Sequence, residues 1–106
     1  MRDLFDRQLA LIAARDLEGL LAQYHDDARV VRLDRTAHGP EEVRALFADY
    51  LKLEPTVEEV RSVQLAGDVI LYNAHMTLAG NRVNAFGTLV VRDALIWRQT
   101  AAAVPL

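Results

Sequence analysis

The sequence has no cysteine and a single lysine, Lys52, and both shortages argue against certain classes of function. Without cysteine there is no disulfide framework, no thiolate nucleophile and no cysteine-type zinc site. The other basic residues are arginines scattered along the chain, and the net charge is −3, which argues against nucleic acid as a partner. No apolar run approaches the roughly 20 residues that a membrane span needs, so no membrane partner is expected.

The length of 106 residues fits one domain, and we expect a single domain over residues 1–106. The first residues, MRDLFDRQLA, are amphipathic and carry acids, unlike a signal peptide, which favours a cytoplasmic location. A chain of this size buries about two-thirds of its unfolded surface, so a partner subunit would add stability.

Apolar periodicity in the first half predicts helices over 3–15, 17–25 and 40–53. Asp16 is the expected cap of the second helix. In HGPEEV, Pro40 suits the first helical position, and two glutamates follow it at the positive end of the helix dipole. Glu54 precedes a proline and should therefore leave the third helix.

The second half is rich in β-branched and aromatic residues between turn signals at AGD, AGN and RDA. Strands are predicted over 29–35, 56–66, 69–79, 82–92 and 95–103. Both faces of the last three strands are largely apolar, so we expect helices on one face and a second copy of the chain on the other. Helices followed by an antiparallel sheet indicate an α+β fold class.

The passages ARDLEGLLAQYHDDARVV and HGPEEVRALFADYL, followed by three long strands, resemble the nuclear transport factor two-like superfamily. Within it, the chain is most similar to SnoaL-like polyketide cyclases and ketosteroid isomerases, over nearly its whole length. The resemblance implies a cone, in which a curved antiparallel sheet wraps a long helix around a deep pocket. Members include isomerases, cyclases, epoxide hydrolases, dehydratases and proteins without catalysis, so fold alone does not settle function.

The resemblance to ketosteroid isomerases does not extend to their catalytic residues. The positions of their tyrosine, aspartate base and neutral aspartic acid align with Gln8, Arg32 and Thr88, or Gly87 after a shift of one residue. Because an arginine does not deprotonate in proteins, it cannot act as the base. A steroid delta-isomerase is therefore not expected, and only Tyr24, which matches a supporting tyrosine, carries over.

Strand alternation assigns side chains to the two faces of the sheet, with that alignment setting the parity. The predicted concave set is Val30, Arg32, Asp34, Ile70, Tyr72, Ala74, Met76, Leu78, Asn84, Phe86, Thr88, Val90, Trp97, Gln99, Ala101 and Ala103. The predicted convex set is Leu71, Asn73, His75, Thr77, Leu89 and Val91. A mostly apolar lining with a few polar groups is typical of small-molecule pockets. The expected substrate-binding residues are Tyr24, Met76, Asn84, Phe86, Thr88, Trp97 and Gln99.

The pair Arg32 and Asp34 is the leading catalytic candidate. Asp34 would act as a general base, and Arg32 and Tyr72 would donate hydrogen bonds to a substrate oxygen. Arg-x-Asp resembles part of the epoxide-hydrolase arrangement of the superfamily, although the second acid of that arrangement has no counterpart on the concave positions. The alternative is an ion pair at the rim that serves solubility alone.

The histidines favour structural roles. His25, Asp26 and Asp27 are expected at a helix end, where consecutive side chains do not converge as metal ligands must. His38 is expected at a helix start, where it could cap the helix or reach the pocket mouth, and His75 on the convex face. No metal and no cofactor is therefore expected.

Two functions remain open from the sequence. One is an enzyme that isomerises, cyclises or hydrates a compact, mostly apolar substrate by acid–base chemistry, as a SnoaL-like cyclase, an isomerase or an epoxide hydrolase would. The other is a non-catalytic ligand-binding or dimerisation domain of the same fold. Under both, a homodimer through the convex sheet face is expected.

Overall fold

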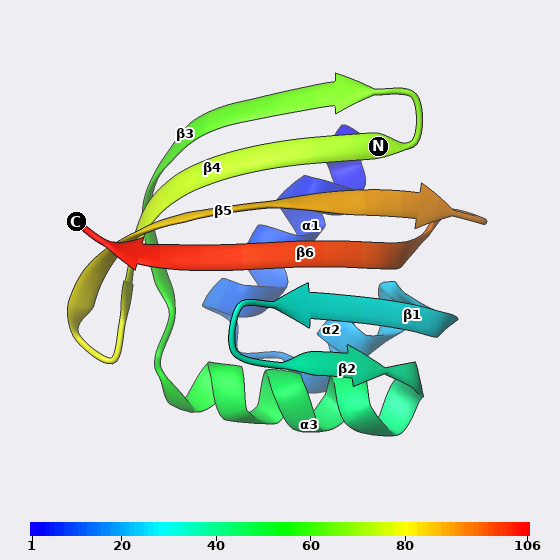
Figure 1. Cartoon of the computed structure of the whole chain (residues 1–106), viewed down its shortest axis with the longest axis horizontal. Helices are drawn as coiled ribbons and strands as arrows, with labels where there is room; N and C mark the ends of the chain where they lie inside the picture. Colours follow the sequence, from blue (N-terminus) through cyan, green and yellow to red (C-terminus); the bar gives the residue numbers. More distant parts are fainter.

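Three helices and six strands form the protein, and the computed structural model describes all 106 residues (Figure 1). The elements are α1 (Arg2–Ala13), α2 (Leu17–Ala22), β1 (Tyr24–Arg32), β2 (Thr36–His38), α3 (Gly39–Lys52), β3 (Thr56–Ala66), β4 (Val69–Leu78), β5 (Asn81–Arg92) and β6 (Leu95–Pro105). None of the helices combines the length and the apolar character needed to cross a membrane.

The strands make one curved, unclosed sheet in the order β2-β1-β6-β5-β4-β3. All neighbouring strands run antiparallel except β1 and β6, which run parallel. In Figure 1, α1 passes behind the long strands and α3 lies along the β2 edge. The α+β class and the curved sheet are therefore as the sequence predicts, and the resulting cone has its hollow on the side of α1.

The helices bury one face each, as their periodicity predicts. Leu4 and Phe5 of α1 and Val43, Leu46 and Phe47 of α3 are buried in one core cluster with the inward side chains of the sheet. Asp16 caps α2 by accepting a hydrogen bond from the backbone N–H of Gly19. Glu54 has a φ of 52° and lies outside α3, as expected before a proline.

The segment after α2 differs from the prediction. α2 ends at Ala22 and β1 begins at Tyr24, so His25, Asp26 and Asp27 lie in a strand and not at a helix end. The strand is fixed there by the last strand, because the Ile96 N–H donates to the carbonyl of Gln23. β1 then stops at Arg32, and a hairpin leads into β2, which the sequence did not predict.

The face assignment for β5 is wrong by one residue. The β4–β5 turn is Ala79-Gly80, so Leu78 pairs with Asn81. The ungapped alignment that set the predicted faces is one residue out of step with this pairing, and a shift of one residue exchanges the two faces of a strand. Leu89, predicted on the convex face, is therefore buried inside. The inward residues of β5 are Ala85, Gly87 and Leu89.

An extra residue on β6 changes the faces a second time. Val90 pairs with Arg98 whereas Val91 pairs with Ile96, so Trp97 has no partner on β5. Such a bulge places two residues opposite one and shifts the alternation beyond it. Ile96 is therefore fully buried. Its partner Val91 packs against the core for the same reason as Leu89, although it was predicted on the convex face. Gln99 and Ala101 keep the inward direction that the sequence predicts.

Candidate functional site: an apolar pocket with polar groups at both ends

The concave face of the sheet and the helices α1 and α3 enclose a pocket of about 410 Å³. Of its 23 lining residues, 19 are hydrophobic, and they come from α1, α3 and all the long strands. Small alanines of β6 at positions 101–103 leave the space that larger side chains would fill. The size and the apolar lining are those of small-molecule sites.

Arg32 and Asp34 lie together at the pocket mouth. Arg32 is the last residue of β1, and Asp34 lies in the following turn, which the Arg32 N–H closes by donating to the Arg35 carbonyl (2.8 Å). The guanidinium donates to both carboxylate oxygens of Asp34, with Nε–Oδ1 3.0 Å and Nη2–Oδ2 2.9 Å. The hairpin, and not one pleat face of a strand, therefore brings the two charges together.

This pairing decides what Asp34 can do as a base. Its side chain is 69% exposed, and the hydrogen bonds from Arg32 hold the pKa of the carboxyl below its ordinary value. A lower pKa makes a carboxylate a weaker proton acceptor, whereas general bases are most effective with a pKa near the working pH. Asp34 can thus accept a proton efficiently only if a ligand separates it from Arg32.

The inner end of the pocket carries uncharged polar groups. The inner end is the part of the lining where the polar side chains are buried: Tyr72 of β4, Gln99 of β6 and Gln8 of α1. Burial raises the pKa of Tyr72, which the neighbouring Gln99 amide only partly opposes, so the hydroxyl keeps its proton at neutral pH. Behind Gln99, the hydroxyl of Tyr24 donates to its Oε1.

Tyr72 needs the glycine that faces it on β5. A Cβ at Gly87 would lie 2.8 Å from the Tyr72 hydroxyl oxygen and 2.1 Å from the backbone carbonyl oxygen of Thr100. Both approaches are shorter than van der Waals contact, so a side chain at Gly87 would push the tyrosine or the β5–β6 pairing aside. Gly87 thus gives Tyr72 its place at the inner end.

The sequence-predicted residues divide between the pocket and the outside. Arg32, Asp34, Tyr72, Met76 and Gln99 line the cavity, and Tyr24 lies behind it, 8% exposed. The structure does not bring the other four to the pocket, because the β4–β5 turn and the β6 bulge direct them to the outer face of the sheet. These four are Asn84, Phe86, Thr88 and Trp97.

Three of the four outer residues have partners of their own. Asn84 accepts a hydrogen bond from the Asn73 amide, and Thr88 shares one with Thr100 (2.7 Å). Phe86 is 40% exposed on the same face. The ring of Trp97 lies against the guanidinium of Arg98, with Cζ 3.7 Å from the ring centroid, and Arg92 also contacts it.

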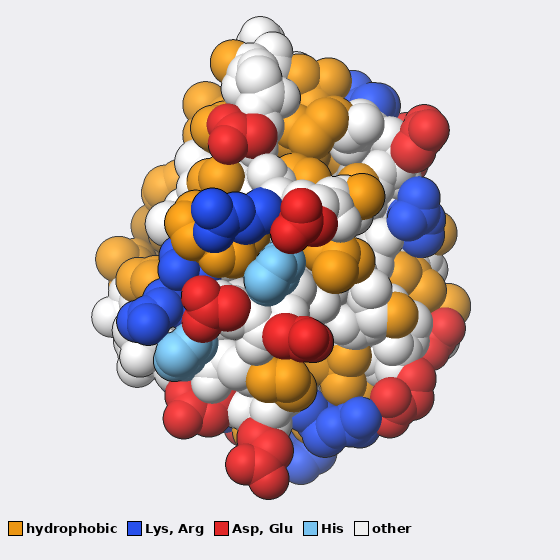
Figure 2. Space-filling view, turned by 90° about the vertical axis from the view of Figure 1, so that its right-hand side faces the viewer, with side chains coloured by type: hydrophobic (Ala, Val, Ile, Leu, Met, Phe, Trp, Pro, Cys, Tyr) orange, Lys and Arg blue, Asp and Glu red, His pale blue; other side chains and the backbone are white.

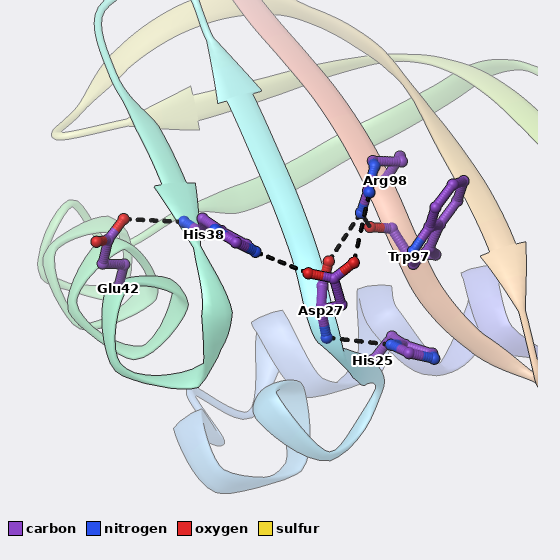
Figure 3. A network of polar contacts seen from close by, with 6 residues as sticks. All are labelled: His25, Asp27, His38, Glu42, Trp97 and Arg98. Atoms are coloured by element: carbon purple, nitrogen blue, oxygen red, sulfur yellow. Dashed lines mark hydrogen bonds and ion pairs between the residues drawn. The ribbon is translucent and has the colours of Figure 1, made fainter.

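A polar cluster centred on Asp27 lies beside Trp97 at one end of the outer face (Figure 3). Asp27 accepts from His38 Nε2 at 2.8 Å and lies 3.6 Å from Arg98 Nη2, and the hydrogen bond with His38 holds the pKa of Asp27 below its ordinary value. Glu42 accepts from the His38 backbone N–H, so His38 binds through its backbone at the start of α3 and through its ring to β1. Figure 2 shows charges of both signs interspersed at this end of the molecule.

No three histidine or acidic side chains come close enough together to hold a metal ion. His25 contacts Asp93 (3.5 Å) and accepts from the Asp27 N–H, while His38 is turned toward Asp27. His75 lies on the outer strand face, opposite Asn84 on β5. None of the three histidines lines the pocket.

Two buried glutamines were missed as site residues. Gln8 is 6% exposed and Gln23 4%, and they donate and accept hydrogen bonds behind the inner end of the pocket. One signal was in the sequence: Gln8 falls within the apolar stripe of α1, four residues after Leu4 and four before Ile12. A polar residue in such a stripe requires buried partners.

The comparisons with known proteins place the chain in a family. The model of the SnoaL-like domain matches residues 5–99, and the chain belongs to this family. None of the curated proteins matches it.

Solved structures share the fold at low sequence identity. A candidate ketosteroid isomerase from Kribbella flavida is 19% identical, with a TM-score of 0.85 over 99% of this chain and 78% of that one. A candidate polyketide cyclase from Sinorhizobium meliloti is 18% identical, with a TM-score of 0.82 over 93% of both chains. A de novo designed protein with a curved sheet is 21% identical, with a TM-score of 0.81 over 98% of this chain and 84% of that one. Likeness at this level shows the fold alone.

Proposed function

We propose that this protein binds a compact, mostly apolar small molecule in the pocket between the sheet and α1. The observation that carries the proposal is the cavity of about 410 Å³, lined by 19 hydrophobic residues out of 23 and by polar groups at its two ends. Buried apolar surface contributes about 25 cal/mol per Å² to binding of such a ligand, and the polar ends orient it. No cofactor is needed for this function.

Blocking the cavity tests the proposal. Ala101 lines the pocket, so Ala101→Phe fills it, whereas Ala45 lies on the exposed side of α3 and Ala45→Phe adds the same atoms outside. A library of small apolar molecules is screened by ligand-observed NMR against the unmodified protein and both variants. We expect hits that the Ala101→Phe variant loses and the Ala45→Phe variant keeps. Hits that survive Ala101→Phe would place binding elsewhere and refute the proposal.

A second candidate function is catalysis of isomerisation, cyclisation or hydration on the bound molecule. The observation in its favour is that the exposed Asp34 and the buried hydroxyl of Tyr72 line the same pocket, so a ligand there meets a carboxylate and a hydrogen-bond donor. In this reaction a substrate oxygen displaces Asp34 from Arg32, and the freed carboxylate accepts a proton. The lowered pKa of Asp34 and its exposure are the reasons that binding ranks first.

Substitution of the carboxylate separates the two candidates. Asp34→Asn keeps the shape and removes the proton acceptor, so turnover of a bound hit is expected to fall about 10²–10⁴-fold while its Kd stays nearly unchanged. Asp49, which is exposed and paired with Arg35 at 2.9 Å, supplies the matched control Asp49→Asn. Equal turnover in both variants would exclude Asp34 as the base and leave the binding function intact.

We also propose that the outer face of the sheet joins two copies of the chain. Leu71, Phe86 and Val104 lie on this face and are 50%, 40% and 40% exposed, and they come from the three adjacent strands β4, β5 and β6. The Asn73 amide bonds to Asn84 and the Thr88 hydroxyl to Thr100, which lowers the cost of covering these groups. A second copy offers the same surface, so the contact is self-complementary.

Light scattering at micromolar concentration is expected to report twice 11.9 kDa. Phe86→Glu should return the protein to a monomer, whereas Leu33→Glu, at an 83% exposed position beyond β1, should leave the dimer intact. A monomer without any substitution would refute the assignment.

A further inference from the structure

A chain of buried hydrogen bonds leads from the protein surface to the inner end of the pocket. Arg7 Nη1 donates to Gln23 Oε1 (2.9 Å), Gln23 Nε2 to Gln8 Oε1 (3.0 Å), and Gln8 Nε2 to the Tyr24 hydroxyl (2.9 Å). The Tyr24 hydroxyl in turn donates to Gln99 Oε1. The three glutamines and the tyrosine are each less than a tenth exposed, so water does not compete for these groups.

The donor-to-acceptor direction of this series of hydrogen bonds is fixed at its start by one group that can only donate and one that can only accept. A guanidinium only donates, so Gln23 must turn its amide oxygen toward Arg7. The same Gln23 Nε2 also donates to the Leu4 carbonyl (3.0 Å), and a carbonyl only accepts. Two independent partners therefore set the orientation of the Gln23 amide, which its shape alone would leave ambiguous.

Each later residue in the series is oriented by the residue before it. Because Gln23 offers N–H to Gln8, Gln8 must present its oxygen there and its nitrogen to Tyr24. The Tyr24 oxygen accepts from Gln8, and its single proton goes to Gln99 Oε1. With its oxygen held by Tyr24, Gln99 has its amide N–H groups left for the cavity that it lines.

The inner end of the pocket thus presents donors. The Gln99 amide contributes N–H, and the Tyr72 hydroxyl beside it keeps its proton because burial raises its pKa. The carboxylate of Asp34 is the charged acceptor of the lining, and it is exposed, with both oxygens bonded to Arg32.

We propose that the inner end of the pocket selects its ligand by an oxygen that accepts hydrogen bonds and has no proton of its own, such as a ketone, ester, ether or epoxide oxygen held by Gln99 and Tyr72. This inference rests on the proposed binding function and names the class of its ligand. A hydroxyl at the same place can accept from Gln99 and donate to the Tyr72 oxygen, but one hydroxyl proton, its own or that of Tyr72, is then left without an acceptor. An unpaired buried polar group of this kind weakens binding about tenfold or more.

The experiment compares three probes of one shape: 1-tetralone with a carbonyl oxygen, 1-tetralol with a hydroxyl, and tetralin with neither. Dissociation constants are measured by NMR titration of the full chain. We expect tetralone to bind about tenfold or more tightly than both others. Tetralol binding as tightly as tetralone would overturn the inference while leaving the pocket as the binding site.

Gln99→Glu is a more stringent test. It replaces the amide nitrogen, which donates, by a second oxygen, while the first side-chain oxygen still accepts from Tyr24. The order of the ketone and the alcohol should then reverse. Gln64→Glu, at an exposed position of β3, makes the same chemical change outside the pocket and should preserve the order. An unchanged order in the Gln99→Glu variant would contradict the assignment.

A further test uses the unmodified, ligand-free protein, so it depends neither on a probe nor on the folding of a variant. Nuclear Overhauser contacts from the Gln99 amide protons should reach the Tyr72 ring, and those from the Gln8 amide protons should reach the Tyr24 ring. If the Gln99 amide protons contact the Tyr24 ring instead, the direction of the hydrogen bonds is reversed, and the inference is overturned. If none of the three probes binds, the proposed binding function fails for ligands of this size, and these contacts still decide the direction of the chain.

Discussion

Raising the pH above about 10 is expected to unfold the protein through its three tyrosines. Burial raises the pKa of Tyr24 well above its ordinary value and also raises those of Tyr50 and Tyr72. In the unfolded chain the same groups ionise near pH 10. Lysine is the other side chain that titrates in this range, and the chain has only Lys52, so the tyrosines dominate the response.

The sign and the size follow from proton linkage. A folded-state pKa above the unfolded value means that the stabilisation is complete below pH 10 and is lost as the pH rises toward the folded value. Between its unfolded and folded pKa values, each tyrosine lowers the free energy of unfolding by about 1.4 kcal/mol per pH unit, so the three together lower it by at most about 4 kcal/mol per unit. A loss of this size per pH unit is a large fraction of the whole stability of a typical domain.

Urea unfolding followed by circular dichroism at several pH values measures this slope, and the ultraviolet absorbance of tyrosinate reports ionisation directly. Tyr24→Phe should reduce the slope to about two-thirds, because one of the three linked protons is gone. Tyrosines that ionise near pH 10 while circular dichroism still reports the folded state would refute the burial on which the reasoning depends.

Further substitutions test the packing. Gly87→Ala should destabilise the protein by more than about 2 kcal/mol in urea unfolding, because the added Cβ collides with Tyr72 and with a backbone carbonyl of β6; a neutral result would place Tyr72 elsewhere. Leu20→Ala should cost about 2–5 kcal/mol at a fully buried site, whereas Leu33→Ala, 83% exposed, should cost less than about 0.5 kcal/mol, and equal costs would contradict the core. Ala94→Gly should raise the melting temperature slightly, because Ala94 has a φ of 62°, and a fall would show that the turn carries no strain.

The fold could be predicted because its signals are local and repeated. The apolar stripes of α1 and α3, the Pro40 start signal and the turn residues each depend on neighbours within a few positions. β2 was not predicted, since three residues carry too little periodicity to stand out. The early start of β1 at Tyr24 also escaped, because the bond that fixes it comes from Ile96, far along the chain.

The site was predicted in part for a related reason. Tyr72 and Met76 follow from simple alternation along β4, and both line the pocket. The faces of Phe86 and Trp97 depend on one residue more or less in a turn and in a bulge, and a single step exchanges the two sides of a strand. The partners of Gln8 are Gln23 and Tyr24, and they depend on the packing of α1 against the junction of α2 and β1, which no short stretch of sequence encodes.

The parallel pairing of β1 with β6 has a consequence for how the chain folds as it is synthesised. Tyr24 pairs with Ile96, and the segments between them supply the rest of the sheet. A ribosome adds about 5–20 residues per second, so β1 waits for seconds before its central neighbour emerges. During that time the hairpins of β3, β4 and β5 can form, but β1 has only the short β2 beside it. The pocket also lacks Gln99 until β6 arrives. Closure of such a distant pair is intrinsically slow, so a nascent chain stalled before β6 should expose the apolar side of β1 and be recognised by chaperones.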